Sequence, residues 1–324
     1  MDHREHYCRF FVTGGPTAGP PVLFFMRKPL YLLKTNTMNF FFITTDHFDD
    51  RIWFIDDDDF KVAMNYVPIA SVVADVTILA FILMSNHIHF LVEGTREGAD
   101  HFINHFKKIY GMHYERKYSV REFLRRNTVD TQELYTANEA LEKCIAYIIM
   151  NPVAANICAF PSDYLWGSGN AFFNPSPMRG TRVSSLSGRK RRSLLHSKTK
   201  VSYGMLIGEE GFIHPRSYVA VKFVESLFRT PSRMHFFLKN SSKAKKRLDK
   251  DASPSFRDQS IIASSQDLCR SLFRKSSQDE LTPEELVEFL KQLKRRFSAD
   301  VNQLARVTGI SRVEISRKLE GLQL

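Results

Sequence analysis

The chain has 324 residues, of which 46 are Lys or Arg and 35 are Asp or Glu, giving a formal net charge of +11. Hydrophobic residues make up 43% and aromatic residues 12%, which excludes a mostly disordered chain and leaves room for two packed domains. No apolar run approaches the roughly 20 residues of a membrane-spanning helix, so we expect no membrane partner. The positive charge favours partners rich in phosphate.

The cysteines Cys8, Cys144, Cys158 and Cys269 are scattered, and no Cys-x-x-Cys pair occurs. This spacing is typical of neither a disulfide framework nor a thiolate zinc site. It favours a reducing, cytoplasmic location. Residues 1–37 contain Gly-Gly-Pro and Pro-Pro sequences, and we expect them to be poorly structured, with Met26 or Met38 as an alternative start.

Strand patterns come first in the structured part of the chain. Residues 39–45 (NFFFITT) are aromatic and β-branched, which predicts a strand. Residues 76–84 and 87–93 are two apolar runs around a polar Ser-Asn turn, which predicts a hairpin.

Helical patterns lie between and after these strands. Apolar residues at three- and four-residue spacing predict helices at 100–118 and at about 138–151, the second stopped by Pro152. The aspartates at 56–59 precede a third helical pattern. A metal site is one interpretation of them, but carboxylates also stabilise a helix N-terminus, and we favour that role. Strands alternating with long helices predict an α+β domain over residues 38–174, with an antiparallel sheet packed against helices.

The next segment is strongly basic. Residues 164–208 contain no Asp or Glu, and Arg189, Lys190, Arg191 and Arg192 lie at their centre. We therefore expect this stretch to be solvated and mobile, and we expect residues 175–250 to contact nucleic acid; a solubilising linker is the alternative. The Ser-rich stretch that follows predicts a linker over residues 251–280.

The C-terminal segment, residues 281–324, carries three helix signals. Thr282 and Pro283 open the first, Gly309 closes the second, and Ser311 caps the third. The third helix would present outward three cations that can contact DNA: Arg312, Arg317 and Lys318. This pattern predicts a helix-turn-helix domain that binds duplex DNA; a generic helical bundle is the alternative.

Two histidines interrupt the apolar strand at 87–93. Because residues i and i+2 of a strand share a face, His87 and His89 should lie side by side while Ile88 packs into the core. Such a pair is a preset metal site. Tyr147 and Asn151 are four residues apart and so share one helix face. Over the histidines, Asn151 could offer a third ligand and Tyr147 a nucleophile; the alternative is that Tyr147 only packs in the core.

Three blocks in residues 39–170 together resemble the single-tyrosine HUH transposase domain, specifically its REP-associated tyrosine transposase branch. They are residues 80–93 (AFILMSNHIHFLVE), 106–110 (FKKIY) and 146–155 (AYIIMNPVAA). Two features depart from the family pattern. Trp-Gly-Ser at 166–168 stands where relatives usually have Trp-Ser-Ser, and residues 122–126 lack the family's Gly-x-Leu-Trp patch.

The resemblance implies a ferredoxin-like HUH core in which His87, His89 and Asn151 hold Mg²⁺ or Mn²⁺. It implies that Tyr147 is the nucleophile of a single-strand DNA endonuclease and transposase, forming a 5′-phosphotyrosyl intermediate with hairpin-bearing single-stranded DNA. Rival nucleophiles by residue type are Tyr110, Tyr114 and Tyr118. Whether the protein is a monomer or a homodimer stays open.

Two other functions remain open. The first is a domesticated DNA-binding regulator without nuclease activity, which would use the helix-turn-helix and the basic segment. The second is a zinc hydrolase built on the histidine pair. It needs a nearby carboxylate base, and Glu93 would lie about 13 Å from His89 along the strand, too far to serve easily.

Overall fold

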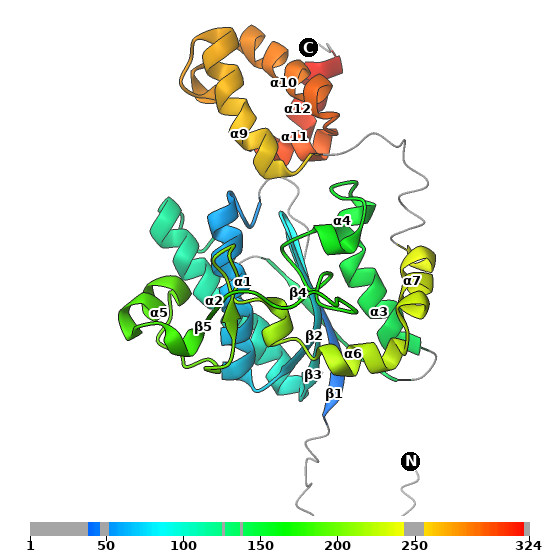
Figure 1. The fold of residues 1–324 in the computed structure, drawn as a ribbon. Helices are drawn as coiled ribbons and strands as arrows, with labels where there is room; N and C mark the ends of the chain where they lie inside the picture. The colour runs from blue at the N-terminus through cyan, green and yellow to red at the C-terminus, as the bar shows by residue number, and fades with distance from the viewer. Residues whose placement is uncertain (1–37, 46–51, 125–126, 137–138, 243–255, 321–324) are drawn as a thin grey trace, which may run out of the picture. The chain divides into compact units, whose positions relative to one another are not determined.

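The computed structural model describes residues 38–45, 52–124, 127–136, 139–242 and 256–320 (Figure 1). The poorly structured N-terminal segment expected at 1–37 therefore lies outside the described residues. The end of the basic segment expected at 175–250, residues 243–250, lies outside them as well.

The centre of the fold is a four-stranded antiparallel sheet with the strand order β2-β3-β1-β4. The hairpin predicted at 76–84 and 87–93 is confirmed as β2 and β3, and the strand at 39–45 is confirmed as β1. Strand β4 was not predicted from the sequence. The bounds are β1 Asn39–Thr45, β2 Thr77–Met84, β3 His87–Gly94 and β4 Val129–Leu134.

Helices cover both faces of this sheet (Figure 1). Helices α1 and α2 pack on one face, and α3 packs on the other, where α6 and α7 also lie. The acidic run is thus at the start of a helix, α1, and the helix predicted at 100–118 is confirmed as α2. The bounds are α1 Asp57–Ala74, α2 Arg96–Tyr118, α3 Ala140–Ile149, α4 Asn151–Ala154, α6 Val221–Phe228 and α7 Pro231–Asn240.

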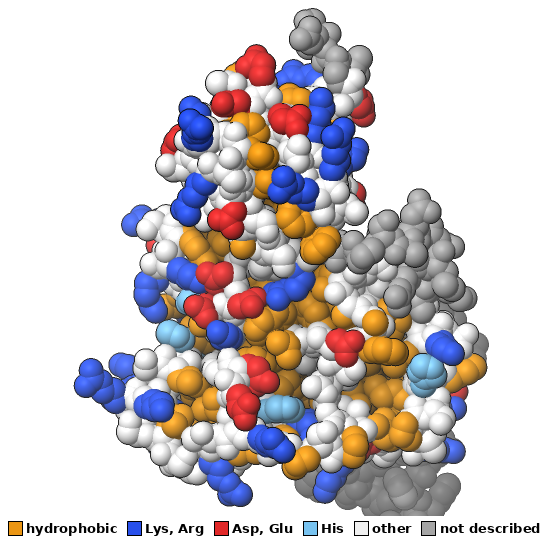
Figure 2. Space-filling view, turned by 45° about the horizontal axis from the view of Figure 1, so that its top comes forward, with side chains coloured by type: hydrophobic (Ala, Val, Ile, Leu, Met, Phe, Trp, Pro, Cys, Tyr) orange, Lys and Arg blue, Asp and Glu red, His pale blue; other side chains and the backbone are white. Residues whose placement is uncertain are grey.

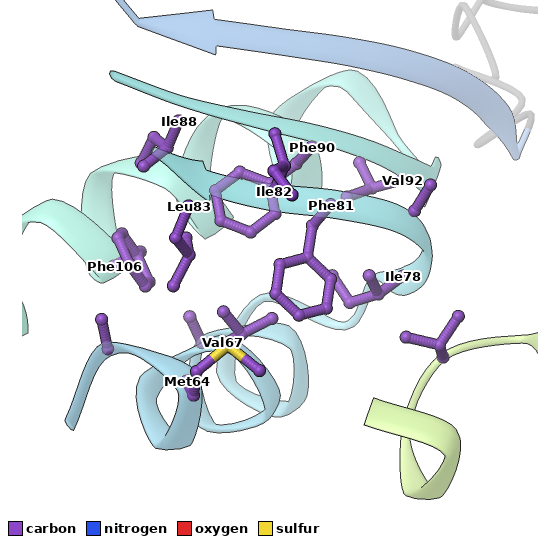
Figure 3. Packing of buried hydrophobic residues seen from close by; sticks show 14 of the residues in the cluster. Met64, Val67, Ile78, Phe81, Ile82, Leu83, Ile88, Phe90, Val92 and Phe106 are labelled. Atoms are coloured by element: carbon purple, nitrogen blue, oxygen red, sulfur yellow. The ribbon is translucent and has the colours of Figure 1, made fainter. Parts of the chain in front are cut away.

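The face under α1 and α2 is a closely packed apolar layer (Figure 3). Met64 and Val67 of α1 lie against Phe81 of β2, and the ring of Phe90 on β3 lies 4.9 Å from that of Phe102 on α2. Since β3 alternates, the side chains of Ile88 and Phe90 enter this layer while His87 and His89 point to the opposite face.

A charged cluster joins α1 to α2. Asp59 is fully buried in the first turn of α1, where it forms a capping box with Asp56. Its carboxylate also accepts hydrogen bonds from His113 (3.2 Å), Lys117 (2.9 Å) and Tyr118 (2.8 Å) of α2. Asp56 and Asp59 therefore cap the helix, the role that the sequence favoured.

A short segment after α4 covers the outer edge of β2. The backbone N–H of Leu83 donates to the carbonyl of Trp166 (2.8 Å), and that of Ser168 donates to the carbonyl of Phe81 (3.0 Å). A Cβ atom at Gly167 would lie 2.5 Å from Ile82 Cδ1 and 2.9 Å from the carbonyl oxygen of Phe81. The backbone at this position therefore leaves no room for a side chain.

The expectation that residues 164–208 form a solvated, mobile stretch is wrong, and residues 209–242 are folded with them. Val183, Leu195, Ile213 and Val224 are fully or almost fully buried in the same hydrophobic core as the sheet. The sequence pattern did not indicate this burial, because many Lys and Arg residues lie between the apolar positions. The additional elements are β5 Thr181–Arg182, α5 Gly188–Leu195 and β6 Leu206–Ile207, with 3₁₀ turns at Pro161–Asp163, Val183–Ser185 and Pro215–Ser217.

The C-terminal helices form a second hydrophobic core around Phe289, Leu290 and Ile315. The linker expected at 251–280 is wrong from residue 258 onward, because α9 belongs to this core: Asp258 at its start pairs with Arg306 of α11 (2.9 Å). The three predicted helices are present. The bounds are α9 Asp258–Leu268, a π turn Cys269–Phe273, a 3₁₀ turn Gln278–Glu280, α10 Pro283–Phe297, α11 Val301–Thr308 and α12 Arg312–Glu320.

Within the described residues, every helix is too short or too polar to cross a lipid bilayer.

Candidate active site

His87 and His89 lie side by side on the sheet face that α3 covers. Their ring centroids are 4.9 Å apart, and the residues are only 5% and 2% exposed. Cross-strand register places His89 between Ile82 of β2 and Thr44 of β1. The two imidazoles are therefore held by a central strand of the sheet, as the spacing predicted.

Helix α3 brings Tyr147 to this pair. The Tyr147 ring is edge-on to His89, with 5.5 Å between the centroids. Phe42 of β1 completes the group, since its ring lies 5.6 Å from that of His89 and 5.9 Å from that of Tyr147. Sequence reasoning missed Phe42, because its proximity depends on which strand pairs with β3. The structure thus places the rings of Tyr147 and Phe42 against the His89 imidazole.

The polar neighbour of His87 selects its tautomer. Asn86 Oδ1 lies 2.9 Å from His87 Nδ1. An amide oxygen only accepts, so Nδ1 carries the hydrogen and, in the neutral ring, the lone pair is on Nε2. An acceptor that is hydrogen-bonded to one ring nitrogen fixes the orientation of an imidazole whose other nitrogen binds a metal. Asn86 was read from the sequence only as part of a turn.

Asn151 follows Tyr147 by one helical turn and is 4% exposed. Its Nδ2 donates to the carbonyl oxygens of Tyr147 (2.9 Å) and Ile148 (3.0 Å). These bonds satisfy the C-terminal end of α3, where the helix breaks at Met150 before Pro152. With Nδ2 engaged, Oδ1 is the end of the amide that can serve as a ligand.

Tyr147 is a phenol in a partly buried setting. Burial raises the pKa of Tyr147 above its ordinary value of 10.0, and neighbouring Cys144 adds to the shift. The phenol is therefore protonated at neutral pH. A nearby divalent cation would favour the phenolate and activate the oxygen as a nucleophile.

The two adjacent imidazoles are ligands of a kind that binds a divalent cation. Among the described residues, no three His, Cys, Asp or Glu side chains converge as a metal cluster. Two adjacent imidazoles and an amide oxygen would leave room for water or a phosphate oxygen. Imidazole nitrogen suits Mn²⁺ better than Mg²⁺, which prefers oxygen.

The rival tyrosines lie on the other face of the sheet. Tyr110 is fully buried on α2 and donates its hydroxyl to the carbonyl of Trp53. Tyr114 stacks on Phe123, and Tyr118 donates to Asp59. The same α2 helix supplies Phe102, which packs beneath Phe90 rather than near the histidines. Of these tyrosines, only Tyr147 lies at the histidine pair.

The basic cluster of Arg189, Lys190, Arg191 and Arg192 is on α5, which packs against α1. The structure does not bring it to the histidine pair, because α1 covers the opposite face of the sheet (Figure 1). All four are exposed or half-buried, and the Arg191 guanidinium lies 5.2 Å from the centroid of the Tyr203 ring.

The cations of α12 lie in the C-terminal core's outer layer. Arg312 and Arg317 are exposed, and Arg312 donates to Asn302 of α11 (3.1 Å). Lys318 is half-buried and pairs with Glu314 at 3.6 Å. Arg312 and Arg317 are thus exposed to solvent, whereas Lys318 is half-buried and engaged within its own helix.

Comparisons with known proteins do not place the chain in a family. No family model matches the sequence, and no curated protein matches it. Among solved structures, it is similar to a REP-associated tyrosine transposase bound to a REP hairpin, with 12% identity and a TM-score of 0.32. The match covers 42% of this chain and 79% of that chain. A superposition this loose describes a partial likeness and nothing more.

Proposed function

We propose that the protein cleaves and rejoins single-stranded DNA, with Tyr147 as the covalent nucleophile. The observation that supports this most is the position of the Tyr147 ring, 5.5 Å from that of His89, which in turn lies 4.9 Å from His87. A protonated phenol alone is a poor nucleophile, and two buried imidazoles are an environment that can hold the activating cation.

In the proposed reaction, Tyr147 Oη attacks the phosphorus of the scissile phosphodiester. A bond from Oη to phosphorus forms, and the bond from phosphorus to the 3′-oxygen breaks. The phenol loses its proton, and the departing 3′-oxygen gains one. The products are a 5′-phosphotyrosyl protein and a free 3′-hydroxyl, which can attack the same linkage to rejoin a strand without ATP.

His87, His89 and Asn151 are the residues that would hold Mn²⁺ or Mg²⁺. A divalent cation at this position would polarise the phosphate and lower the pKa of the phenol. Asn86 holds the His87 ring in the tautomer with its lone pair on Nε2. Phe42 excludes water from one side of the Tyr147 ring. Cleavage within a duplex is disfavoured, because the backbone must bend into a site between sheet and helix.

The direct test is to incubate the protein with 3′-labelled single-stranded DNA from the region flanking its gene, with Mn²⁺, and to separate denatured protein by gel. We expect a labelled covalent adduct from the wild type and none from Tyr147→Phe. Tyr135→Phe is the matched control, since Tyr135 is 74% exposed and lies at the end of β4. An adduct that persists in Tyr147→Phe would refute the assignment.

A second function, sequence-specific duplex binding, is favoured by one feature of the C-terminal core. Val313, in the first turn of α12, is 81% exposed and follows Arg312 directly in the sequence. An exposed apolar side chain with Arg312 before it and Arg317 one turn later is suited to a thymine methyl and neighbouring phosphates in the major groove. If the protein were only a regulator, duplex binding would occur in EDTA and would survive His87→Ala, and no adduct would form.

A further inference from the structure

A hollow of about 720 Å³ lies beside α6, between that helix and the loop at 173–178. Its volume is in the range of small-molecule sites, roughly 300–1,000 Å³. The side chains that matter here are Phe173, Met178, Arg216, Lys222, Phe223 and Glu225.

One wall is held in a strained backbone conformation. Phe173 has a φ of +48°, a left-handed conformation that is unusual for a bulky side chain. The Glu225 carboxylate fixes it by accepting the Phe173 N–H at 2.6 Å. Arg216 anchors the same loop by donating to the carbonyl of Ser176 (2.6 Å). Strain of this kind persists where surrounding contacts hold it, and it concentrates at functional sites.

The other wall is continuous with the candidate active site. The Phe223 ring stacks on Phe40 of β1 at 5.8 Å with an interplanar angle of 13°. Phe42, which touches Tyr147 and His89, is two residues further along the strand on the same face, about 7 Å away. The hollow and Tyr147 thus lie on one sheet face, connected through Phe40 and Phe42 of β1.

The chemistry of the hollow matches a nucleotide. Phe173 and Phe223 offer apolar ring surface, and Lys222 is an exposed cation at the rim. Arg216 adds a second positive charge, so the cations outnumber the one carboxylate, Glu225. Aromatic rings beside cations are the usual platform for unpaired bases and their phosphates.

We propose that this hollow binds one nucleotide of the single-stranded substrate next to the scissile phosphate. The base lies against Phe173 and Phe223, and Lys222 neutralises the adjoining phosphate. The proposal rests on the DNA-processing function above and adds a base-binding subsite to it.

The test measures the affinity of fluorescein-labelled twelve-nucleotide oligo-dT by anisotropy, without metal. Phe173→Gly removes the ring while suiting the positive φ, and we expect at least about fivefold weaker binding. Lys222→Gln should reduce the slope of log affinity against log salt by about 0.7. The matched controls, Phe236→Ala and Lys239→Gln, change an exposed ring and an exposed cation on α7; both should bind like the wild type.

A second readout uses oligo-dT carrying one 5-iododeoxyuridine, crosslinked by light and mapped by mass spectrometry. Crosslinks to Phe173 or Phe223 support the subsite. Affinity unchanged in both Phe173→Gly and Lys222→Gln, or crosslinks that map only elsewhere, would overturn it. These assays need no covalent chemistry. If the wild type forms no adduct but binds oligo-dT at the hollow, only the proposed reaction is refuted. If the wild type forms the adduct at Tyr147 but does not bind a base at the hollow, only the subsite is refuted.

Discussion

The side chain of His87 is oriented by its neighbour in the β2–β3 turn. Asn86 Oδ1 holds Nδ1 of the ring at 2.9 Å, so the nitrogen that can bind a cation is selected before the cation arrives. Mutation of a residue that is hydrogen-bonded to a metal-binding histidine typically weakens metal affinity by about 10- to 100-fold.

Replacement of Asn86 therefore tests the histidine site without touching a ligand. We expect Asn86→Ala to bind Mn²⁺ about 10-fold more weakly in a titration followed by electron paramagnetic resonance. Asn86→Asp keeps an acceptor oxygen at that position and should restore most of the affinity. Equal affinity in the wild type and Asn86→Ala would show that the pair does not act as a metal site.

The sequence predicted that His87, His89 and Tyr147 lie together, but not what surrounds them. The His-x-His spacing and the interval from Tyr147 to Asn151 follow from strand and helix periods, so those residues could be predicted. The contact of Phe42 depends on β1 pairing with β3, a long-range choice that no local pattern encodes. The Nδ2 bonds of Asn151 depend on where α3 ends, and helix boundaries are poorly specified by sequence.

At the scale of elements, the edge of β2 is closed by a glycine that leaves no room for a side chain. In Gly167→Ser, the added Cβ would clash with Ile82 Cδ1 and with the carbonyl oxygen of Phe81. We expect a loss of about 1–3 kcal/mol in the free energy of unfolding. Gly111→Ser is the control, because a Cβ there meets nothing within 4 Å and helix propensity improves. Denaturant unfolding of both variants measures the difference, and equal stability would contradict the clash.

The clamp between α1 and α2 predicts acid sensitivity. Burial alone would raise the pKa of Asp59, but hydrogen bonds from His113, Lys117, Tyr118 and the Ile55 N–H outweigh it and hold the pKa below its ordinary 3.8. A depressed pKa in the folded state means that the carboxylate stabilises the fold above pH 3.8. This contribution is lost as the pH falls through the folded-state value.

Asp59→Asn removes that charge from a fully buried position. We expect it to lower the free energy of unfolding at pH 7 by about 3 kcal/mol, because it leaves Lys117 without its buried carboxylate. The difference from the wild type should shrink as the pH falls below 4 in denaturant titrations. A difference that stayed constant down to pH 2 would contradict the assignment of the effect to ionised Asp59.

Which elements could be predicted follows from their local signals. Strands β1, β2 and β3 are rich in apolar and aromatic residues, and helices α1 and α2 have regular apolar spacing and side-chain N-caps. Strand β4 reads Val-Asp-Thr-Gln-Glu-Leu, an exposed edge strand whose polar residues hide its period. Helices α5 to α7 lie in a cation-rich stretch whose charge outweighed its apolar positions in the prediction, and tertiary packing stabilises them.

At the scale of the whole molecule, the net charge of +11 is spread over several surfaces. On the face in Figure 2, Lys and Arg side chains are distributed among Asp and Glu rather than gathered into one continuous patch. The basic helix α5 lies on the α1 side of the sheet, and Tyr147 lies on the other. A substrate that used both would have to pass around the sheet, as a folded hairpin with single-stranded flanks can do.

The exposed cations of α12 predict a separate duplex-binding activity. Arg312→Ala with Arg317→Ala should reduce the slope of log affinity against log salt by about 0.9 per arginine for a duplex probe. Adduct formation on single-stranded DNA should be unchanged. Lys291→Ala, an exposed cation on α10, serves as the control. An unaltered salt slope would exclude α12 from the duplex interface.

The central claim is that Tyr147 becomes covalently joined to DNA. The most direct measurement is mass spectrometry of the gel-purified adduct after nuclease and trypsin digestion. We predict a peptide that contains Tyr147 and carries the mass of a phosphodeoxynucleotide, with fragment ions that place the group on that side chain. The modification on Tyr110, Tyr114, Tyr118 or any residue other than Tyr147 would contradict the account.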